Sequence, residues 1–301
     1  MNKAVDIGFL EEKQGWLLHP RFFPSKVGGK PAWLDLKNLP NPKEITCKKC
    51  NDPLILLCQV YAPFEEKAEC FHRTIFIFIC KNGSCCQSNC ADNFVVLRSQ
   101  LGRKNDFYSF EPYEENENEG LTSINPCDFL VTESGKSVLF KEWELIVDEE
   151  DEEEATDVDT NKEMDKLAKL LQEKKGGSLN SIDDNELEQY TSTLPKDKVF
   201  NKFNKRVSRH PEQVLRYQRG GAPLWITGNK NNEILHVPNC KYCDGEREFE
   251  FQIMPQLLNF INVGLDVNSI DWGILAIYTC KNSCNTGPAY KEEYLIKQDL
   301  N

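Results

Sequence analysis

The stretch that decides the fold is Gly28-Gly-Lys-Pro-Ala-Trp33, which is followed by the cysteine pair Cys47-Lys-Lys-Cys50. Both features recur in the last third of the chain, as Gly220-Gly-Ala-Pro-Leu-Trp225 and Cys240-Lys-Tyr-Cys243. Self-similarity at a fixed separation is the sequence signature of a repeated structural unit. The 301 residues are therefore predicted to contain two copies of one unit.

Three further features follow in the same order in each copy. An apolar run that contains a glutamine comes first, then a longer apolar run that ends in cysteines, and then a short closing apolar segment. In the first copy they occupy residues 54–63, 71–85 and 94–97, and in the second they occupy residues 249–255, 271–284 and 294–296. Corresponding features are offset by 192 to 200 residues. The pattern predicts a duplicated module of about 100 residues.

Each copy is predicted to be rich in β-structure. Ile75-Phe-Ile-Phe-Ile79 is a continuous run of β-formers, which is typical of a strand covered on both faces. Phe249-Glu-Phe-Gln-Ile253 alternates in polarity, as a strand with one wet face should. The predicted fold class is α+β and β-rich, with one β-sheet module in residues 1–110 and the second in residues 196–301.

Helices are expected near the middle of the chain and ahead of the second module. Apolar residues at helical spacing mark one helix around 164–171 and another around 200–207. A third is expected to begin at Pro211, because proline suits the first position of a helix, and to reach Tyr217.

An acidic segment separates the two modules. Residues 111–195 carry 25 Asp and Glu against 7 Lys and Arg, whereas the rest of the chain is mildly basic. A run such as residues 148–154, which is entirely acidic, repels itself and has no apolar side chain to bury. We predict an acidic, largely disordered linker with short helices. It serves either to keep the protein soluble or to hold something basic.

The strongest chemical signal is a Cys-x-x-Cys pair joined to a second cysteine pair at the end of a later strand, present in both modules. A short pair on a turn places two thiolates about 3.7 Å apart, which is the sulfur spacing of tetrahedral zinc. The pattern predicts up to two structural zinc ions. The predicted ligands are Cys47, Cys50, Cys80 and Cys85 in the first module, with Cys86 competing with Cys85, and Cys240, Cys243, Cys280 and Cys284 in the second.

No catalytic constellation is apparent, and we predict no catalytic residues. A redox Cys-x-x-Cys favours a helix N-terminus, whereas strands follow these pairs. The four histidines have no obvious nucleophile beside them, and no P-loop, Gly-x-Gly-x-x-Gly or Gly-x-Ser-x-Gly motif occurs. The parts predicted to fold are only mildly basic and the acidic linker would repel phosphate, so direct nucleic-acid binding is not expected. With no apolar run of membrane-spanning length and a charged N-terminus, we expect a soluble intracellular binding protein.

The chain resembles the programmed cell death protein 2 family of eukaryotes, in particular its founding branch. The similarity covers both modules and leaves only the acidic middle unmatched. The matching stretches are residues 23–33, Gln59-Val-Tyr-Ala-Pro63, Phe71-His-Arg73, residues 100–112, Gln213-Val-Leu-Arg-Tyr217, residues 251–258 and residues 269–276. One departure is the MYND-type zinc finger that the founding branch carries after its first module. This chain has only Cys127 between residues 113 and 138, so that finger is missing.

The resemblance implies a function as a dedicated, non-enzymatic chaperone. Its client would be one small-subunit ribosomal protein, ribosomal protein S-two, which is the eukaryotic homologue of bacterial S-five. The protein would protect this client until assembly of the 40S subunit, in the cytoplasm with shuttling to the nucleus, and would be monomeric apart from the client. Two other classes stay open at this point. One is a zinc-dependent transcription or chromatin cofactor that acts by protein binding, and the other is a thiol oxidoreductase.

Overall fold

The computed structural model describes residues 4–109, 139–151, 198–228, 236–261, 263 and 269–300. These residues form antiparallel strands, one α-helix and several short 3-10 turns. The strands are β1 Asp6–Glu11, β2 Lys26–Val27, β3 Ile55–Tyr61, β4 His72–Ile79, β5 Phe94–Leu101, β6 Trp143–Glu149, β7 Leu215–Tyr217, β8 Arg247–Ile253, β9 Ile274–Cys280, β10 Tyr290–Glu292 and β11 Tyr294–Gln298. The α-helix is α3 Lys198–Val207, and the 3-10 turns are η1 Gly15–Leu18, η2 Pro20–Phe22, η3 Pro42–Ile45, η4 Ala68–Cys70, η5 Gly83–Cys85 and η9 Pro255–Asn259. None of the helices in these ranges is long and apolar enough to cross a membrane.

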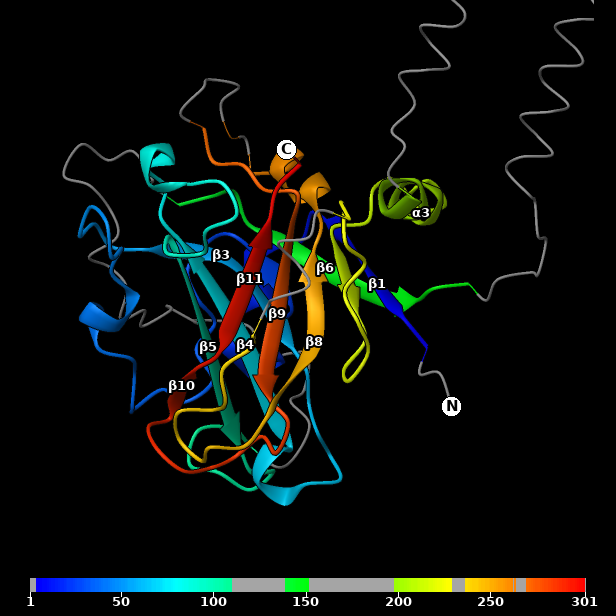
Figure 1. Ribbon diagram of the computed structural model, residues 1–301. Helices are drawn as coiled ribbons and strands as arrows, with labels where there is room; N and C mark the ends of the chain where they lie inside the picture. Colours follow the sequence, from blue (N-terminus) through cyan, green and yellow to red (C-terminus); the bar gives the residue numbers. More distant parts are fainter. Residues whose placement is uncertain are drawn as a thin grey trace, which may run out of the picture.

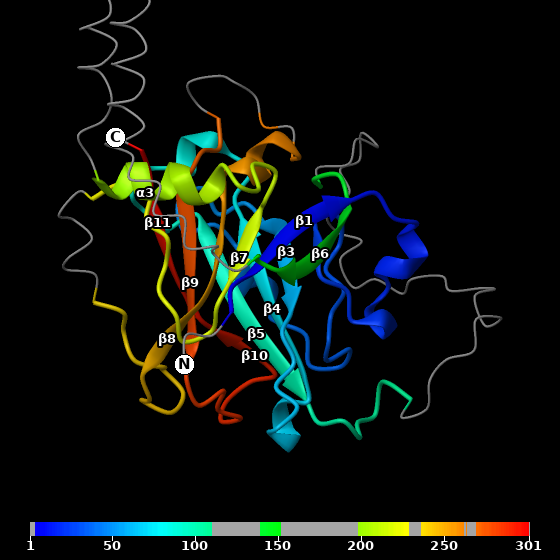
Figure 2. The same cartoon turned by 90° about the vertical axis from the view of Figure 1, so that its right-hand side faces the viewer.

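The strands of the described residues form one sheet in the order β10-β5-β4-β3-β2-β6-β1-β7-β8-β9-β11. The first copy supplies β2 to β5, and the second supplies β7, β8, β9 and β11 in the mirrored order. Strands β6 and β1 lie at the centre, between the two copies (Figure 2). The β-rich prediction is confirmed, and the two copies of the repeat share a single continuous sheet.

The two ends of the sheet meet. Strands β10 and β11 are separated only by Glu293, yet β10 pairs with β5 of the first copy and β11 pairs with β9 of the second. The backbone N–H of Glu293 donates to the carbonyl of Val96 in β5 at 2.9 Å. The sheet therefore curls until β8, β9 and β11 lie in front of β3, β4 and β5 (Figure 1).

The main hydrophobic core lies between these two layers. It combines buried side chains of both copies, such as Leu57 and Ile77 from one layer with Phe251 and Ile277 from the other. All four are less than 1% exposed. Because each layer buries its inner face on the other, neither copy has a complete core of its own.

A buried glutamine shows the duplication at atomic detail. In the first copy the backbone N–H of Ala32 donates to Oε1 of Gln59 at 2.8 Å. In the second copy the N–H of Leu224 donates to Oε1 of Gln252 at 2.6 Å. Ala32 and Leu224 each precede the tryptophan of the repeated Gly-Gly-x-Pro-x-Trp motif. The two glutamines therefore fix the same loop in the same way.

The structure corrects the prediction for part of the acidic linker. Residues 143–149 form β6, and residues 144–149 of this strand pair with β1. Glu150, which follows the strand, is 5% exposed and accepts hydrogen bonds from Arg206 and Arg216. Paired charges and the apolar side chain of Leu145 stabilise this segment, which the charge count alone did not reveal. Residues 111–138 and 152–195 of the predicted linker lie outside the described residues.

The expected helices have different outcomes. Helix α3 confirms the prediction around 200–207, and it buries Phe203 and Val207 against Met254 and Ile274. The prediction of a helix that begins at Pro211 is wrong, since residues 215–217 form β7, which pairs with β1 and β8. Sheet pairing on both sides outweighs the local propensity. The helix expected around 164–171 lies outside the described residues.

Candidate metal centres

The first cysteine quartet lies at one end of the first copy. Cys47 and Cys50 occupy the turn after η3, Cys80 follows the last residue of β4, and Cys85 ends η5. The four Sγ atoms lie within 4.8 Å of one another, and those of Cys50 and Cys80 are 3.6 Å apart. The structure thus brings together all four residues that the spacing nominated.

The second quartet repeats this arrangement in the second copy. Cys240 and Cys243 occupy a turn before β8, Cys280 ends β9, and Cys284 lies in the loop that follows. The Sγ atoms of Cys240 and Cys284 are 3.7 Å apart, and those of Cys243 and Cys280 are 3.6 Å apart. All four again lie within 4.8 Å of one another.

The same turn geometry presents the Cys-x-x-Cys pair in both copies. The N–H of Asn51 donates to the carbonyl of Cys47 at 3.0 Å, and the N–H of Asp244 donates to the carbonyl of Cys240 at 2.8 Å. Asn51 and Asp244 both adopt left-handed backbone conformations, with φ of 62° and 57°. Asn and Asp tolerate this region better than other non-glycine residues, so each is suited to close the turn.

The electrostatics of the quartets favour a bound cation. Burial raises the pKa of the Cys85 thiol to about 11 and that of Cys284 to about 12. The thiols of Cys47 and Cys50 add to the effect at Cys85, and the other three thiols of the second quartet add to it at Cys284. Burial opposes ionisation of Cys47 as well, but backbone N–H groups of Cys50 and Lys49 lower its pKa. Four close thiols cannot all ionise without a compensating positive charge, which a metal ion supplies.

The donor set fits zinc. Four sulfur ligands about 2.3 Å from a tetrahedral ion lie about 3.7 Å from one another, which matches the separations of 3.6 and 3.7 Å. A shell of four protein ligands is complete, as in structural zinc sites, and leaves no position for a substrate. The quartets could therefore each hold one metal ion.

The remaining described cysteines stand outside the quartets. Cys86, the competitor of Cys85, directs its Sγ to the carbonyl of Asp271 at 3.2 Å. Cys58 packs in the main core, where burial strongly raises the pKa of its thiol. Cys70 donates to the carbonyl of Ser283, and Cys90 lies 3.9 Å from Nζ of Lys49. Cys127 lies outside the described residues.

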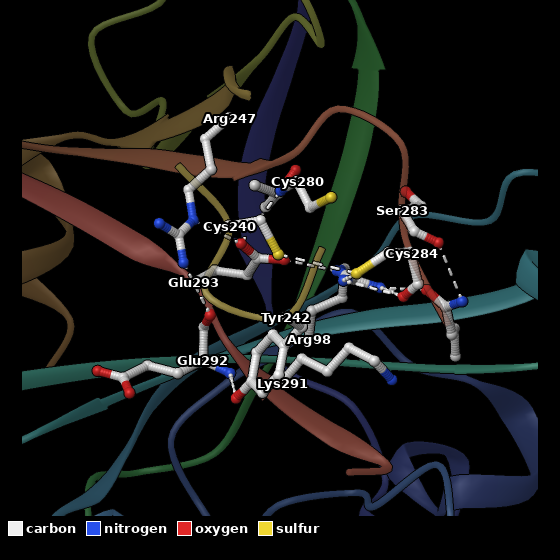
Figure 3. A network of polar contacts seen from close by, with 12 residues as sticks. Arg98, Cys240, Tyr242, Arg247, Cys280, Ser283, Cys284, Lys291, Glu292 and Glu293 are labelled. Carbon is white, nitrogen blue, oxygen red and sulfur yellow. Dashed lines mark hydrogen bonds and ion pairs between the residues drawn. The ribbon is translucent and has the colours of Figure 1, made fainter. Parts of the chain in front are cut away.

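A network of buried charges joins the second quartet to the first copy, and sequence reasoning missed it. Arg98 of β5 donates to Glu293 at 2.7 Å and to the carbonyl of Cys284 at 3.4 Å. Arg247 donates to the other oxygen of Glu293, which also accepts the backbone N–H of Cys280 at 3.1 Å (Figure 3). The only signal of this network in the sequence was Arg98, a charged residue that directly follows the apolar run Phe94-Val-Val-Leu97.

A reciprocal contact joins the first quartet to the second copy. Lys297 of β11 occupies the position that corresponds to Arg98 of β5. Its Nζ lies 3.4 Å from Sγ of Cys86 and 2.9 Å from the carbonyl of Gln87, next to the Cys80–Cys85 loop. Each copy thus holds the cysteine loop of the other with a buried cation.

These features define a class of protein: two fused copies of one β-module, each with a four-cysteine centre, that share a single sheet. Comparison with known proteins gives the family. The model of the programmed cell death protein 2 N-terminal domain matches residues 4–115, and that of the C-terminal domain matches residues 197–299. The chain belongs to the programmed cell death protein 2 family.

Curated relatives extend the match over nearly the whole chain. Programmed cell death protein 2 of Rattus norvegicus is 34% identical, with 99% of this chain and 97% of the relative covered, and that of Mus musculus is 36% identical, with 98% and 96% covered. The rat alignment spans 349 positions, so that relative carries residues that this 301-residue chain lacks. Over 99 residues, 30% of this chain and 24% of the relative, the chain is 33% identical to a Schizosaccharomyces pombe protein named probable 20S rRNA accumulation protein 4. No solved structure matches.

Proposed function

We propose that this protein is a non-enzymatic chaperone of ribosome biogenesis that binds ribosomal protein S-two and escorts it to the 40S subunit. Family membership over both copies of the module carries the proposal. The Schizosaccharomyces pombe relative supports it, because its name connects a protein of this kind with ribosomal RNA.

The cysteine centres act as structural zinc sites in this proposal. Each quartet supplies four ligands to one ion, so the metal stabilises the loops that join the strands and takes no part in turnover. Arg98 and Lys297 then attach each loop to the opposite copy. Loss of either ion would therefore disturb the whole sheet.

The charge of the chain suits a basic client. The net charge is −12, and ribosomal proteins carry basic segments that bind RNA. An acidic binding protein competes with RNA for such segments through Coulomb attraction that salt weakens. In this proposal the protein binds its client in the cytoplasm and shuttles with it to the nucleus.

Co-expression with ribosomal protein S-two, followed by affinity capture, tests the proposal. We expect the client to become soluble and to be recovered with the intact chain in a salt-dependent complex. A matched control with a basic ribosomal protein of the large subunit should give no capture. If S-two stays insoluble and chromatin proteins are recovered from nuclear extract instead, the chaperone role is wrong and a cofactor role replaces it.

A further inference from the structure

The shared sheet has a gap near its centre. Strand β2 consists only of Lys26 and Val27, which pair with β3 on one side and with β6 on the other. On β6 these pairs cover Trp143 and Glu144, although the strand continues to Glu149. Among the described residues, no strand lies beside the second half of β6 on this side.

The backbone of β6 presents hydrogen-bonding groups to the gap. The N–H of Leu145 points toward the gap, since it donates to the carbonyl of Ser25 at 2.9 Å. Backbone groups alternate sides along a strand, so the N–H and C=O of Val147 point the same way. Glu150 confirms the alternation, because its N–H points to the opposite side and donates to Val5. The Val147 side chain is 40% exposed.

A groove of about 430 Å³ lies in this gap. Its lining includes the aromatic side chains of Phe22, Phe23, Tyr61 and Tyr217 together with Val147. Phe23 adopts a left-handed conformation with φ of 50°, which is strained for an aromatic residue, and its ring stacks on His72 with centroids 4.1 Å apart. Phe23 lies three residues before β2 and forms part of the groove wall.

Two acidic residues line the groove, and two more lie next to it in β6. Asp6 and Glu144 line it, and Glu149 lies directly opposite Asp6 in the β1–β6 ladder. Like charges in this position destabilise a sheet. Burial raises the pKa of Asp6, and the neighbouring negative charges of Glu149 and Asp148 raise it further. Only Glu144 among these four forms an ion pair with a described residue, Lys13 at 2.7 Å.

We propose that an extended, basic segment of a partner protein binds in this groove by adding a strand to the open edge of β6. Main-chain hydrogen bonds to Val147 would supply affinity, and the aromatic lining would accept alternate side chains of the segment. The acidic rim selects a basic occupant and disfavours the chain's own residues 111–138 and 152–195, which are strongly acidic. The identity of the partner as ribosomal protein S-two rests on the proposed function, whereas the site itself does not.

Amide hydrogen exchange on the full chain tests the site directly. The probe is a short peptide of alternating arginine and valine, and the control is a peptide of alternating glutamate and valine. We expect the arginine peptide to slow exchange of the Val147 amide about tenfold or more at saturation, and the glutamate peptide to have no effect. Equal protection by both peptides, or by neither, would overturn the proposal.

Two variants separate the backbone from the charge contribution. Val147→Pro removes the N–H that faces the gap without removing a β1–β6 hydrogen bond, and it should weaken peptide binding about tenfold. Asp148→Asn with Glu149→Gln should weaken binding several-fold and flatten its salt dependence. The matched control is Asp92→Asn with Asp106→Asn, which removes the same charge from exposed loops elsewhere. If the acidic variant and the control bind equally well, the groove is not the site.

The two proposals can fail separately. If the intact chain captures S-two, and the groove variants capture it equally well, the groove is wrong and the chaperone function stands. If S-two is not captured but the arginine peptide protects the Val147 amide, the groove is a binding site for basic segments and the proposed identity of the client is wrong.

Discussion

The buried ion pair between Arg73 and Glu250 joins the two copies, and removing only one of its two charges should strongly destabilise the protein. Arg73 lies in β4 of the first copy and Glu250 in β8 of the second, and both side chains are fully buried. The pair is bidentate, with Nη1–Oε1 and Nη2–Oε2 distances of 2.5 and 2.7 Å. Tyr217 also donates to Glu250 at 2.9 Å.

Glu250→Gln should lower the free energy of unfolding by ~3–5 kcal/mol, because it leaves the Arg73 guanidinium buried without a counter-charge. Replacing both residues, Arg73→Met with Glu250→Leu, should recover most of that loss, since two apolar side chains of similar volume remove the desolvation penalty of both ions. Urea denaturation followed by far-ultraviolet circular dichroism measures all three proteins.

The pH dependence of the free energy of unfolding gives an independent measure of this ion pair. Burial alone would raise the pKa of Glu250, but the charge and hydrogen bonds of Arg73 outweigh it and lower the pKa to about 2. Because this pKa is lowered in the folded state, the ionised Glu250 contributes fully to the free energy of unfolding above the ordinary pKa of 4.5. This contribution is lost as the pH falls from 4.5 toward 2. That difference corresponds to ~3 kcal/mol. The gap between wild type and Glu250→Gln should therefore shrink by about this amount between pH 6 and pH 2, while any loss of metal affects both proteins alike.

The reasoning would be refuted by a Glu250→Gln variant that loses less than ~1 kcal/mol at neutral pH. It would also fail if the double variant were less stable than Glu250→Gln, because the cost would then come from packing and not from the unpaired charge.

Other changes have equally definite outcomes. Protein purified without added metal should contain two zinc ions per chain by elemental analysis. The Cys240→Ser variant should lose one ion and melt far below wild type, whereas the control Cys90→Ser should keep both. A folded wild-type protein without metal would contradict this. Arg98→Met should cost ~2–3 kcal/mol in urea, because Glu293 keeps only one of its two arginines, and an unchanged midpoint would show that the network between the copies is dispensable. Gly28→Ala should cost at least ~2 kcal/mol, since a Cβ at its φ of +67° would lie 2.1 Å from the carbonyl oxygen of Lys141; a wild-type melting temperature would mean that this loop relaxes freely.

The features that could be predicted from the sequence are those that recur locally. Both cysteine quartets could be predicted from two short cysteine spacings and the end of a strand. Gln59 and Gln252 occupy equivalent positions of the repeat, and in the structure they accept equivalent backbone hydrogen bonds. Between Cys85 and Cys86 the sequence could not choose, because a one-residue difference depends on how η5 turns, and the structure places only Cys85 among the other three sulfurs.

The features that could not be predicted depend on pairing across long separations. The acidic composition around β6 concealed a strand whose stability comes from β1, more than 130 residues earlier, and from Arg206 and Arg216 beyond the linker. The contacts of Arg98 and Lys297 with the opposite copy likewise become visible only when the sheet has curled. A local charge count carries no information about such partners.

The pairing of β10 with β5 and of β11 with β9 also sets the timing of folding. These two strands follow all the others of the described residues in the chain, so the curled sheet cannot close until residues 290–298 have been synthesised. The first copy must wait with one face of its strands uncovered while the acidic segment and the second copy are made. A nascent chain in this state, or one truncated before residue 290, exposes apolar surface that cellular chaperones and proteases recognise, so incomplete copies of the protein should be removed rather than accumulate.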